Sequence, residues 1–290
     1  MCDEFTVKEN NEYVRERGLT RRNFGKLGVG ISLAAVLPPV ANAQDVAESE
    51  VEIETPDGMA DAYFVHPASG AHPGVIMWPD VLSIRPTYRM MAKRLAQSGY
   101  SVLLVNPYYR TFKGRITPDG ATFADPTIRE LVAPHREALS SETAVIDGKA
   151  YVAFLDQQDA VDTSRKIGSA GYCMTGSYTF RLAAAVPDRV GAGASFHGGG
   201  LTTDSPDSPH FLIPHMNAGM LVAIAANDDE REPGSKDILR ETFDAADVEA
   251  EIEVYAGANH GWTHADSAVY HEEQAERAWS RMLALFEENL

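Results

Sequence analysis

The sequence predicts an α/β fold in which a mostly parallel sheet is covered by helices on both faces. Short apolar runs alternate with segments of helical spacing, which is typical of strands joined by crossover helices. Several runs, such as 101–105 and 219–225, are apolar throughout, as strands buried on both faces are. The chain has 290 residues, 44% of them hydrophobic, which is enough for one large core.

The first elements are expected to be a β-hairpin and a buried strand. Two alternating runs, 51–54 and 60–65, flank the turn-forming residues Thr55-Pro56-Asp57-Gly58. A buried strand is predicted over 73–78, followed by a helix over 88–98. The strand over 101–105 then continues the sheet.

The second half is expected to alternate in the same way. The polar segment 111–147 is where a cap or lid is expected, with a helix over 127–139. A helix over 150–163 should lead to the strand that carries the nucleophile, and a further strand is predicted over 191–196. The C-terminal segment 267–290 has the pattern of an amphipathic helix that packs on the sheet.

Charge and cysteine content exclude several classes of protein. The formal net charge is −17, which disfavours binding to nucleic acid or to an anionic membrane surface. The two cysteines, Cys2 and Cys173, imply no disulfide framework.

Residues 1–43 have the pattern of a bacterial twin-arginine export signal. The pair Arg21-Arg22 precedes an apolar run over 27–40, and Ala41-Asn42-Ala43 matches a cleavage site of the A-x-A type. The run is too short, and too broken by glycine and proline, to be a stable membrane span. We therefore expect the export machinery to be a partner of the precursor, and the mature domain, 44–290, to be periplasmic or secreted. That domain has 19 basic and 37 acidic residues, a formal charge of −18.

The stretch Gly171-Tyr172-Cys173-Met174 is a candidate nucleophile elbow. An apolar run ends in small residues and a helix-like segment begins, so the Cys173 sulfur would lie near the backbone donors of a helix start. Those donors favour the thiolate, which is the reactive form. The alternative is a buried cysteine that only fills the core.

Candidate partners for this sulfur follow two later apolar runs. Asn227-Asp228-Asp229 follows the run over 219–225, and Asn259-His260-Gly261 follows the run over 250–255. Nucleophile, acid and histidine thus occur in the chain order of α/β-hydrolases. His260 and His264 are four residues apart, but Gly261 and the absence of a Glu-x-x-His pattern argue against a metal site, so we expect neither metal nor cofactor.

These motifs resemble the dienelactone hydrolases, the cysteine branch of the α/β-hydrolases. The resemblance rests on Gly171-Tyr172-Cys173-Met174 and Ala258-Asn259-His260-Gly261-Trp262, and it extends from about Val51 to the C-terminus. It implies an α/β-hydrolase fold with a mostly parallel eight-stranded sheet. In the family the acid usually stands four residues before a proline, which favours Asp229, four before Pro233, over Asp228.

Further residues are expected to complete the site. The fold places one oxyanion-hole N–H in the loop after the first buried strand and the other after the nucleophile, which indicates Val81 and Met174. By resemblance, Asp80 stands where the family has a glutamate and His264 where it has a carboxylate-binding arginine. The positions of three more side chains make them candidates for contact with substrate: Tyr108, His197 and Trp262.

The predicted function is hydrolysis of a small carboxylic ester or lactone. Cys173 would attack the carbonyl, His260 would transfer protons, and a thioacyl intermediate would be hydrolysed by water. One alternative is a non-catalytic protein that binds small molecules on a hydrolase scaffold. A second is a serine esterase that uses Ser177, which lies one helical turn beyond the elbow.

Overall fold

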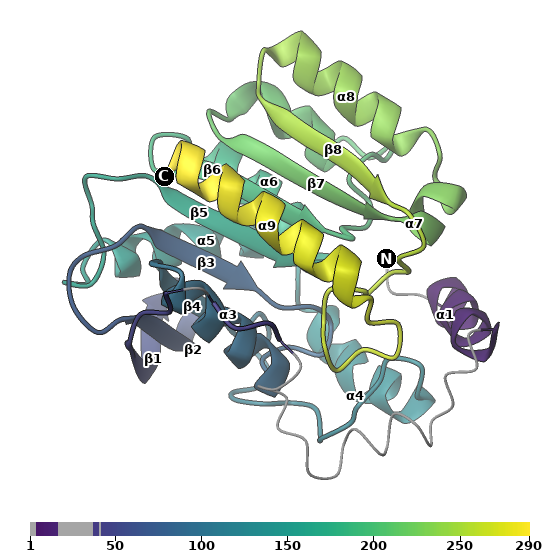
Figure 1. Ribbon diagram of the computed structural model, residues 1–290, viewed down its shortest axis with the longest axis horizontal. Coiled ribbons are helices and arrows are strands. Elements are labelled where there is room, and N and C mark those ends of the chain that lie inside the picture. Colours follow the sequence, from purple (N-terminus) through teal and green to yellow (C-terminus); the bar gives the residue numbers. More distant parts are fainter. Residues whose placement is uncertain (1–3, 17–36, 41) are drawn as a thin grey trace.

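The computed structural model describes residues 4–16, 37–40 and 42–290 (Figure 1). Within them, eight strands form one sheet in the order β1-β2-β4-β3-β5-β6-β7-β8. The β1–β2 and β2–β4 pairs are antiparallel and all others are parallel, which confirms the predicted mostly parallel α/β-hydrolase sheet. The strands are β1 Val46–Thr55, β2 Gly58–Pro67, β3 Gly74–Trp78, β4 Ser101–Val105, β5 Ile167–Tyr172, β6 Val190–Phe196, β7 Gly219–Ala225 and β8 Ala250–Tyr255.

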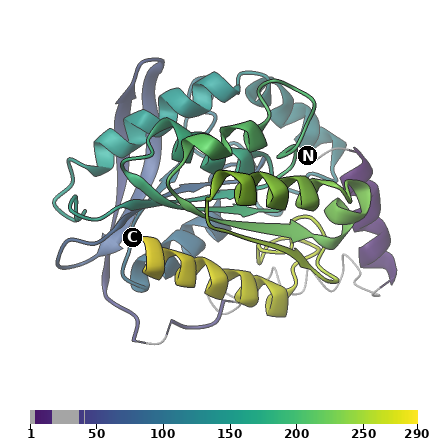
Figure 2. The same ribbon diagram turned by 90° about the horizontal axis from the view of Figure 1, so that it is seen from above.

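Helices cover both faces of this sheet, as Figure 2 shows from above. One face carries α3 (Pro86–Gln97) and α9 (Glu272–Asn289), and the other carries α5 (Ser141–Leu155), α6 (Gly176–Ala185) and α8 (Ser235–Ala246). The alternation of side chains along each strand explains the two layers of core. In β3, Val75 and Met77 pack in the α3/α9 layer, while Ile76 and Trp78 pack in the α5/α6 layer.

The helix α9 is the amphipathic C-terminal helix expected from the sequence, shortened to Glu272–Asn289. Trp279, Met282 and Phe286 lie on its buried face, each at most 7% exposed. Burial of such a side chain contributes roughly 1.5–3 kcal/mol, so this one face accounts for much of the attachment of the helix to the sheet.

Two helices begin earlier than predicted because of capping residues. The helix α3 starts at Pro86, since proline at the first position already has helical φ. The helix expected over 150–163 is α5, Ser141–Leu155, because Ser140 and Thr143 form a capping box at its start. The expectation for that segment was therefore wrong by about two turns.

The connections contribute short helices near the carboxyl ends of the strands. The expected lid segment contains α4 (Pro126–Arg136), with Asp125 as its N-cap. The segment after β7, expected as a loop, is the short helix α7 (Ala226–Arg231). Two 3-10 turns, η2 (Cys173–Thr175) and η3 (Pro209–His215), complete the set of described elements apart from α1.

The predicted leader is described only in part. Its paired arginines and most of its apolar run lie outside the described residues, so the twin-arginine signal stays a prediction. The helix α1 (Glu4–Glu16) is described, and the folded body begins where the Gln44 N–H donates to the Gln97 carbonyl. No helix in the described ranges is long and apolar enough to cross a membrane.

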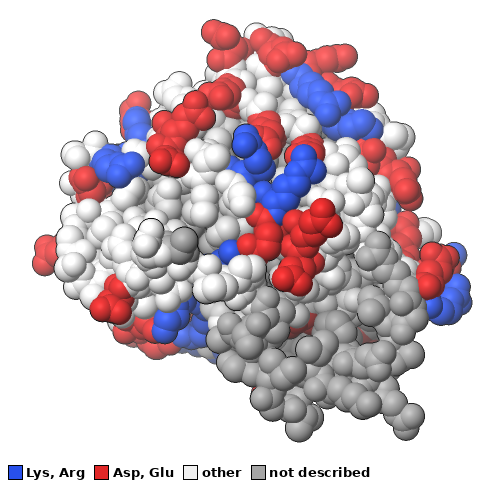
Figure 3. All heavy atoms as spheres, in the orientation of Figure 1, with Lys and Arg blue, Asp and Glu red and all other residues white. Residues whose placement is uncertain are grey.

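Acidic side chains are spread across the face of the molecule in Figure 3, with basic ones beside them. Along β8 and α9 these charges pair across the elements: Arg277 contacts Glu253, and Arg281 contacts Glu251. Such exposed pairs contribute little to stability, about 0–1 kcal/mol each.

Candidate active site

Cys173 lies on a sharp turn between β5 and α6. Its φ is +57°, a left-handed conformation that few non-glycine residues adopt. The turn is so tight that a Cβ on Gly171 would lie 2.2 Å from the Thr175 carbonyl oxygen, so only glycine fits there. The strained strand-to-helix turn expected of a nucleophile elbow is therefore present.

Thr175 stands where such elbows usually have a glycine, and its hydroxyl binds the neighbouring backbone. It accepts a hydrogen bond from the Tyr172 N–H at 3.0 Å, and its oxygen lies 2.9 Å from the Trp78 carbonyl and 3.0 Å from that of Pro79. The close approach falls on Gly176, where a Cβ would lie 2.5 Å from Gly198 Cα. Threonine thus fastens the elbow to the end of β3.

His260 is held by two consecutive residues of α7. Its Nδ1 lies 2.7 Å from Oδ2 of Asp228, and its backbone N–H donates to Oδ1 of Asn227 at 2.8 Å. The expected partner, Asp229, instead binds Nζ of Lys236 at 2.6 Å. The expectation is corrected because Ala226–Arg231 is helical, and adjacent side chains of a helix point about 100° apart.

The pair of His260 and Asp228 has strongly perturbed electrostatics. Burial alone would lower the pKa of His260, but the charges of Asp228 and Cys173 raise that pKa to about 10. Burial likewise opposes ionisation of Asp228, yet the neighbouring His260 lowers the pKa of this carboxyl. The imidazole is therefore protonated at neutral pH and faces a carboxylate on one side and the cysteine on the other.

His197 is the second histidine beside the cysteine, and the sheet register explains why. Tyr172 of β5 is paired with Phe196 of β6, so Cys173 and His197 are the next residues of adjacent parallel strands. Both leave the sheet with positive φ, +57° and +39°. The His197 ring is 4.7 Å from that of His260 and its Nε2 is 3.1 Å from the Thr263 hydroxyl. Burial lowers the pKa of His197, so this ring is neutral.

The two residues predicted for the oxyanion hole meet at one tyrosine. The hydroxyl of Tyr108 donates to the Val81 carbonyl at 2.9 Å and lies 3.7 Å from Sδ of Met174. Tyr108 is itself buried, so the ring that was predicted to contact substrate also links the loop of Val81 to Met174 in the elbow.

Asp80 is bound to a buried arginine rather than to the cysteine. Both carboxylate oxygens accept from Arg85, at 2.6 and 3.0 Å, and the Leu82 N–H donates to Oδ1 at 2.9 Å. Nε of Arg85 also donates to Asp266 at 2.7 Å. The guanidinium is thus shared between two carboxylates, and both oxygens of Asp80 are engaged by Arg85.

His264 and Trp262 are both almost completely buried. Nε2 of His264 lies 2.5 Å from the Tyr88 hydroxyl and 3.8 Å from Asp80. Burial lowers the pKa of His264 to about 4, because Asp80 only partly opposes it. Trp262 stacks on Tyr255 and its indole contacts the His197 ring edge-on at 5.2 Å.

Four residues of this region were not predicted: Arg85, Tyr88, Thr263 and Asp266. Arg85 precedes Pro86, a position that marks a helix start, but nothing in the local pattern indicates a buried ion pair. Arg85 and Asp266 are 181 positions apart, so only the tertiary structure brings them together.

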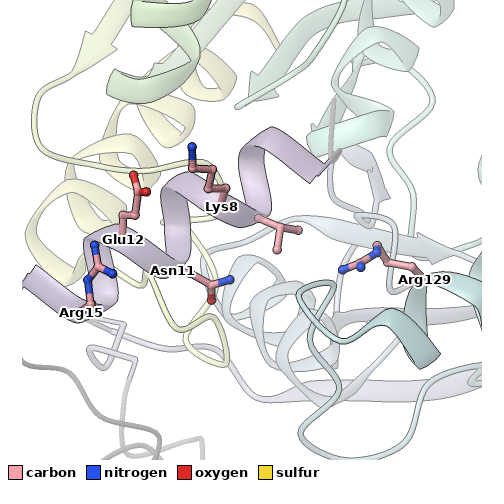
Figure 4. Close-up of a pocket in the computed structure, with 6 residues that line it drawn as sticks. Lys8, Asn11, Glu12, Arg15 and Arg129 are labelled. Atoms are coloured by element: carbon pink, nitrogen blue, oxygen red, sulfur yellow. The ribbon is translucent and has the colours of Figure 1, made fainter.

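The helix α1 packs beside the loop that carries His260. The Asn10 side chain donates to the His260 carbonyl at 3.0 Å, and Glu9 binds Asn227 at 2.7 Å and Arg231 at 2.6 Å. The Tyr13 hydroxyl donates to the Gly257 carbonyl at 3.0 Å. A hollow of about 560 Å³ between α1 and α4 is lined by Val7, Lys8, Asn11, Glu12, Arg15 and Arg129. Figure 4 shows Lys8, Asn11, Glu12 and Arg15 on α1 and Arg129 on α4.

Comparison with known proteins gives a consistent result. The model of the dienelactone hydrolase family matches residues 60–290. A Salmonella typhi protein named "Putative carboxymethylenebutenolidase" is 29% identical, with 81% of this chain and 90% of the relative covered. The "Carboxymethylenebutenolidase" of Rhodococcus opacus is 25% identical, with 78% and 86% covered. A crystal structure from Klebsiella pneumoniae, described as a putative dienelactone hydrolase, superposes with a TM-score of 0.72 at 25% identity, with 84% of this chain and 99% of the other covered.

Proposed function

Because the chain belongs to the dienelactone hydrolase family, whose model covers residues 60–290, we propose that it hydrolyses a small carboxylic ester or lactone through Cys173, His260 and Asp228. The observation that carries this proposal is the contact chain itself. A buried cysteine at a strained elbow touches a histidine, and that histidine is hydrogen-bonded at 2.7 Å to a carboxylate. This is the nucleophile, base and orienting acid that acyl transfer requires.

In the proposed first step, the Cys173 sulfur attacks the carbonyl carbon. The C=O electron pair moves to oxygen, and the tetrahedral intermediate then expels the alkoxide, which takes the proton held by His260. The product is a thioacyl enzyme and an alcohol; with a lactone the alcohol stays attached. In the second step His260 removes a proton from water, the hydroxide attacks the thioester, and the thiolate leaves.

The negative oxygen of each intermediate needs donors beside Cys173. The backbone N–H groups of Val81 and Met174 are the candidates, since both residues contact Tyr108 next to the elbow. Loss of one such donor typically raises the barrier by about 3 kcal/mol. Asp228 keeps the proton of His260 on Nδ1 and stabilises the charged ring.

The expected substrate class follows from how the charged side chains near the site are paired with one another. Arg85, the buried cation beside the loop that carries His264, is shared by Asp80 and Asp266. His264 itself is neutral at pH 7. Neither group offers an uncompensated positive charge to a carboxylate. We therefore expect neutral esters and lactones to be hydrolysed faster than anionic ones of the same size.

The test is a comparison of Cys173→Ala with Ser177→Ala on an activated aryl ester and on neutral and anionic lactones. We expect Cys173→Ala to lower kcat by roughly 10⁵-fold or more, as loss of a nucleophile does in hydrolases, and Ser177→Ala to retain activity. Iodoacetamide should label Cys173 and abolish turnover. Undiminished hydrolysis by Cys173→Ala would reject the proposal, and phosphonate labelling of Ser177 would favour a serine esterase. Stoichiometric binding without turnover would indicate a non-catalytic binding protein.

We also propose that the precursor is exported by the twin-arginine pathway and that the mature enzyme acts in the periplasm or outside the cell. The support is the Arg21-Arg22 pair, the apolar run and the cleavage motif before Gln44. Replacement of both arginines by lysine should leave the protein in the cytoplasm, which cell fractionation and the mass of the chain would show. Export of that variant at the normal level would contradict the assignment.

A further inference from the structure

We propose that Cys173, His197 and His260 together bind a thiophilic divalent cation of the zinc class, and that the bound ion reversibly blocks the hydrolase site. The inhibition rests on the proposed function, but the binding does not. The carrying observation is that one ligand atom from each of these three residues lies within 4.8 Å of the other two. This site is not the pair of His260 and His264, for which the sequence argues against metal binding.

The ligand set is built by the sheet rather than by chance proximity on a surface. Cys173 and His197 follow the paired residues Tyr172 and Phe196 of adjacent parallel strands. All three side chains are nearly inaccessible, with 1%, 1% and 4% of Cys173, His197 and His260 exposed. The three groups are therefore held in one buried space at the carboxyl edge of the sheet.

The distances suit a tetrahedral ion after a small adjustment. Zinc binds thiolate sulfur at about 2.3 Å and imidazole nitrogen at about 2.0–2.1 Å, so tetrahedral ligands lie roughly 3.3–3.6 Å apart. The present limit of 4.8 Å requires the ligand atoms to approach by at most about 1.2–1.5 Å, which rotation about side-chain bonds provides. Three protein ligands leave the fourth position to water.

The second shell is already in place for both rings. Nδ1 of His260 is held by Asp228 at 2.7 Å, the carboxylate–histidine arrangement that orients metal-binding imidazoles. Nε2 of His197 is held by Thr263 at 3.1 Å, while its buried Nδ1 has no hydrogen-bond partner among the described residues. The Asp228 carboxylate also offsets the charge that a divalent ion bound to one thiolate would bring.

Blockage follows directly from the ligand identities. The ion would occupy the sulfur lone pair that attacks the carbonyl and the His260 nitrogen that transfers protons. Hard cations such as Mg²⁺ prefer oxygen ligands and should have no effect. The inhibition should be relieved when a chelator removes the ion.

The experiment uses the full-length protein with Co²⁺ as a spectroscopic probe and Zn²⁺ as the inhibitor. We expect one Co²⁺ per chain, with a thiolate charge-transfer band and the visible bands of a tetrahedral site, and inhibition of aryl-ester hydrolysis by Zn²⁺ but not Mg²⁺. The informative variant is His197→Asn, because asparagine tolerates positive φ. It should bind Co²⁺ at least about tenfold more weakly, since changes even to outer-shell partners cost 10–100-fold.

Two further variants make the result interpretable. His66 lies on β2, which is separated from β5 in the sheet by β4 and β3. The His66→Gln variant should therefore bind Co²⁺ and hydrolyse ester like the parent protein. His197→Cys supplies a different ligand at the same position and should retain tight binding. Unchanged binding in His197→Asn, or no thiolate band in the parent protein, would overturn the three-ligand site. A normal Co²⁺ spectrum without detectable hydrolysis would reject the proposed function and leave the metal site standing.

Discussion

His260 and His264 lie in the same loop, are both buried, and have opposite electrostatic states. The pKa of His260 is raised to about 10, whereas that of His264 is lowered to about 4. Burial pushes both values down, so the partners decide the outcome. His260 is hydrogen-bonded at 2.7 Å to Asp228, from which the Arg231 guanidinium is 3.9 Å away. The carboxylate nearest His264, Asp80, is instead bound by Arg85 at 2.6 Å.

This difference separates the cluster that we propose for catalysis from a second buried cluster at the same edge of the sheet. Around His260 the structure gathers a thiol, two imidazoles and one carboxylate, groups that can exchange protons. Around His264 both carboxylates, Asp80 and Asp266, are hydrogen-bonded to the one guanidinium of Arg85, and the ring is hydrogen-bonded to Tyr88. His264, the position that the family resemblance indicates for substrate recognition, is therefore a buried side chain that contacts its protein neighbours.

The largest effect, on catalytic rate, should come from removing the negative charge of Asp228, which is hydrogen-bonded to His260. Asp228→Asn keeps the size of the side chain but lowers kcat/KM for an activated aryl ester by roughly 10³–10⁴-fold, as in other hydrolase triads. The matched control is the adjacent Asp229→Asn, which breaks only the contact with Lys236 and should cost less than about threefold. A loss in Asp229→Asn as large as that in Asp228→Asn, or no loss in Asp228→Asn, would contradict Asp228 as the carboxylate that orients the histidine.

A smaller effect, on the stability of the fold, is expected from a change in the cluster of Asp80, Arg85 and Asp266. Arg85→Met leaves Asp80 and Asp266 without their buried cation and should lower the free energy of unfolding in urea by about 3–5 kcal/mol. The control is Arg89→Met, whose partner Glu50 is largely exposed and whose loss should cost no more than about 1 kcal/mol. If Arg85→Met were as stable as Arg89→Met, the cluster around His264 would not be structural.

The smallest effect is a pH dependence of the difference in stability between wild type and Asp228→Asn. His260 has a folded pKa of about 10, above its ordinary value of 6.5, so its contribution is complete below about pH 6.5 and is lost as the pH rises through 10. The pKa of Asp228 is lowered, so its contribution is present above its ordinary value of 3.8 and is lost on acidification. Urea unfolding at pH 6, 8 and 10 should show the difference shrinking steadily. A constant difference would contradict a charged pair.

Much of the sheet follows from the sequence because its strands carry their own signal. The candidate residues closely follow the predicted strands, so Cys173, His260 and the acid could be located from the ends of β5, β8 and β7. The choice between Asp228 and Asp229 could not be made in this way. Both follow the same strand, and the short helix α7 that points them apart has no pattern of its own.

The buried ion pairs could not be predicted for a different reason. Asp80 and Arg85 are residue types that usually lie on the surface, and their burial, like the contact of Arg85 with the half-buried Asp266, depends on how the loop after β8 folds over α3. His197 was only a candidate for the pocket, since its place beside Cys173 depends on the register between β5 and β6. Register between distant strands is a property of the whole sheet, not of either segment.

Because the helix α1 contacts the loop that carries His260, the properties of that loop depend on whether the polypeptide includes α1. Its residues bind the backbone around His260 and the side chain of Arg231, yet it precedes the part that the family model matches. In a chain that starts at Gln44, the hydrogen bonds of Asn10 to the His260 carbonyl and of Glu9 to Asn227 and Arg231 are absent, so the loop that carries His260 has different neighbours. Rate constants measured on the long and the short form are therefore separate quantities, and neither stands in for the other.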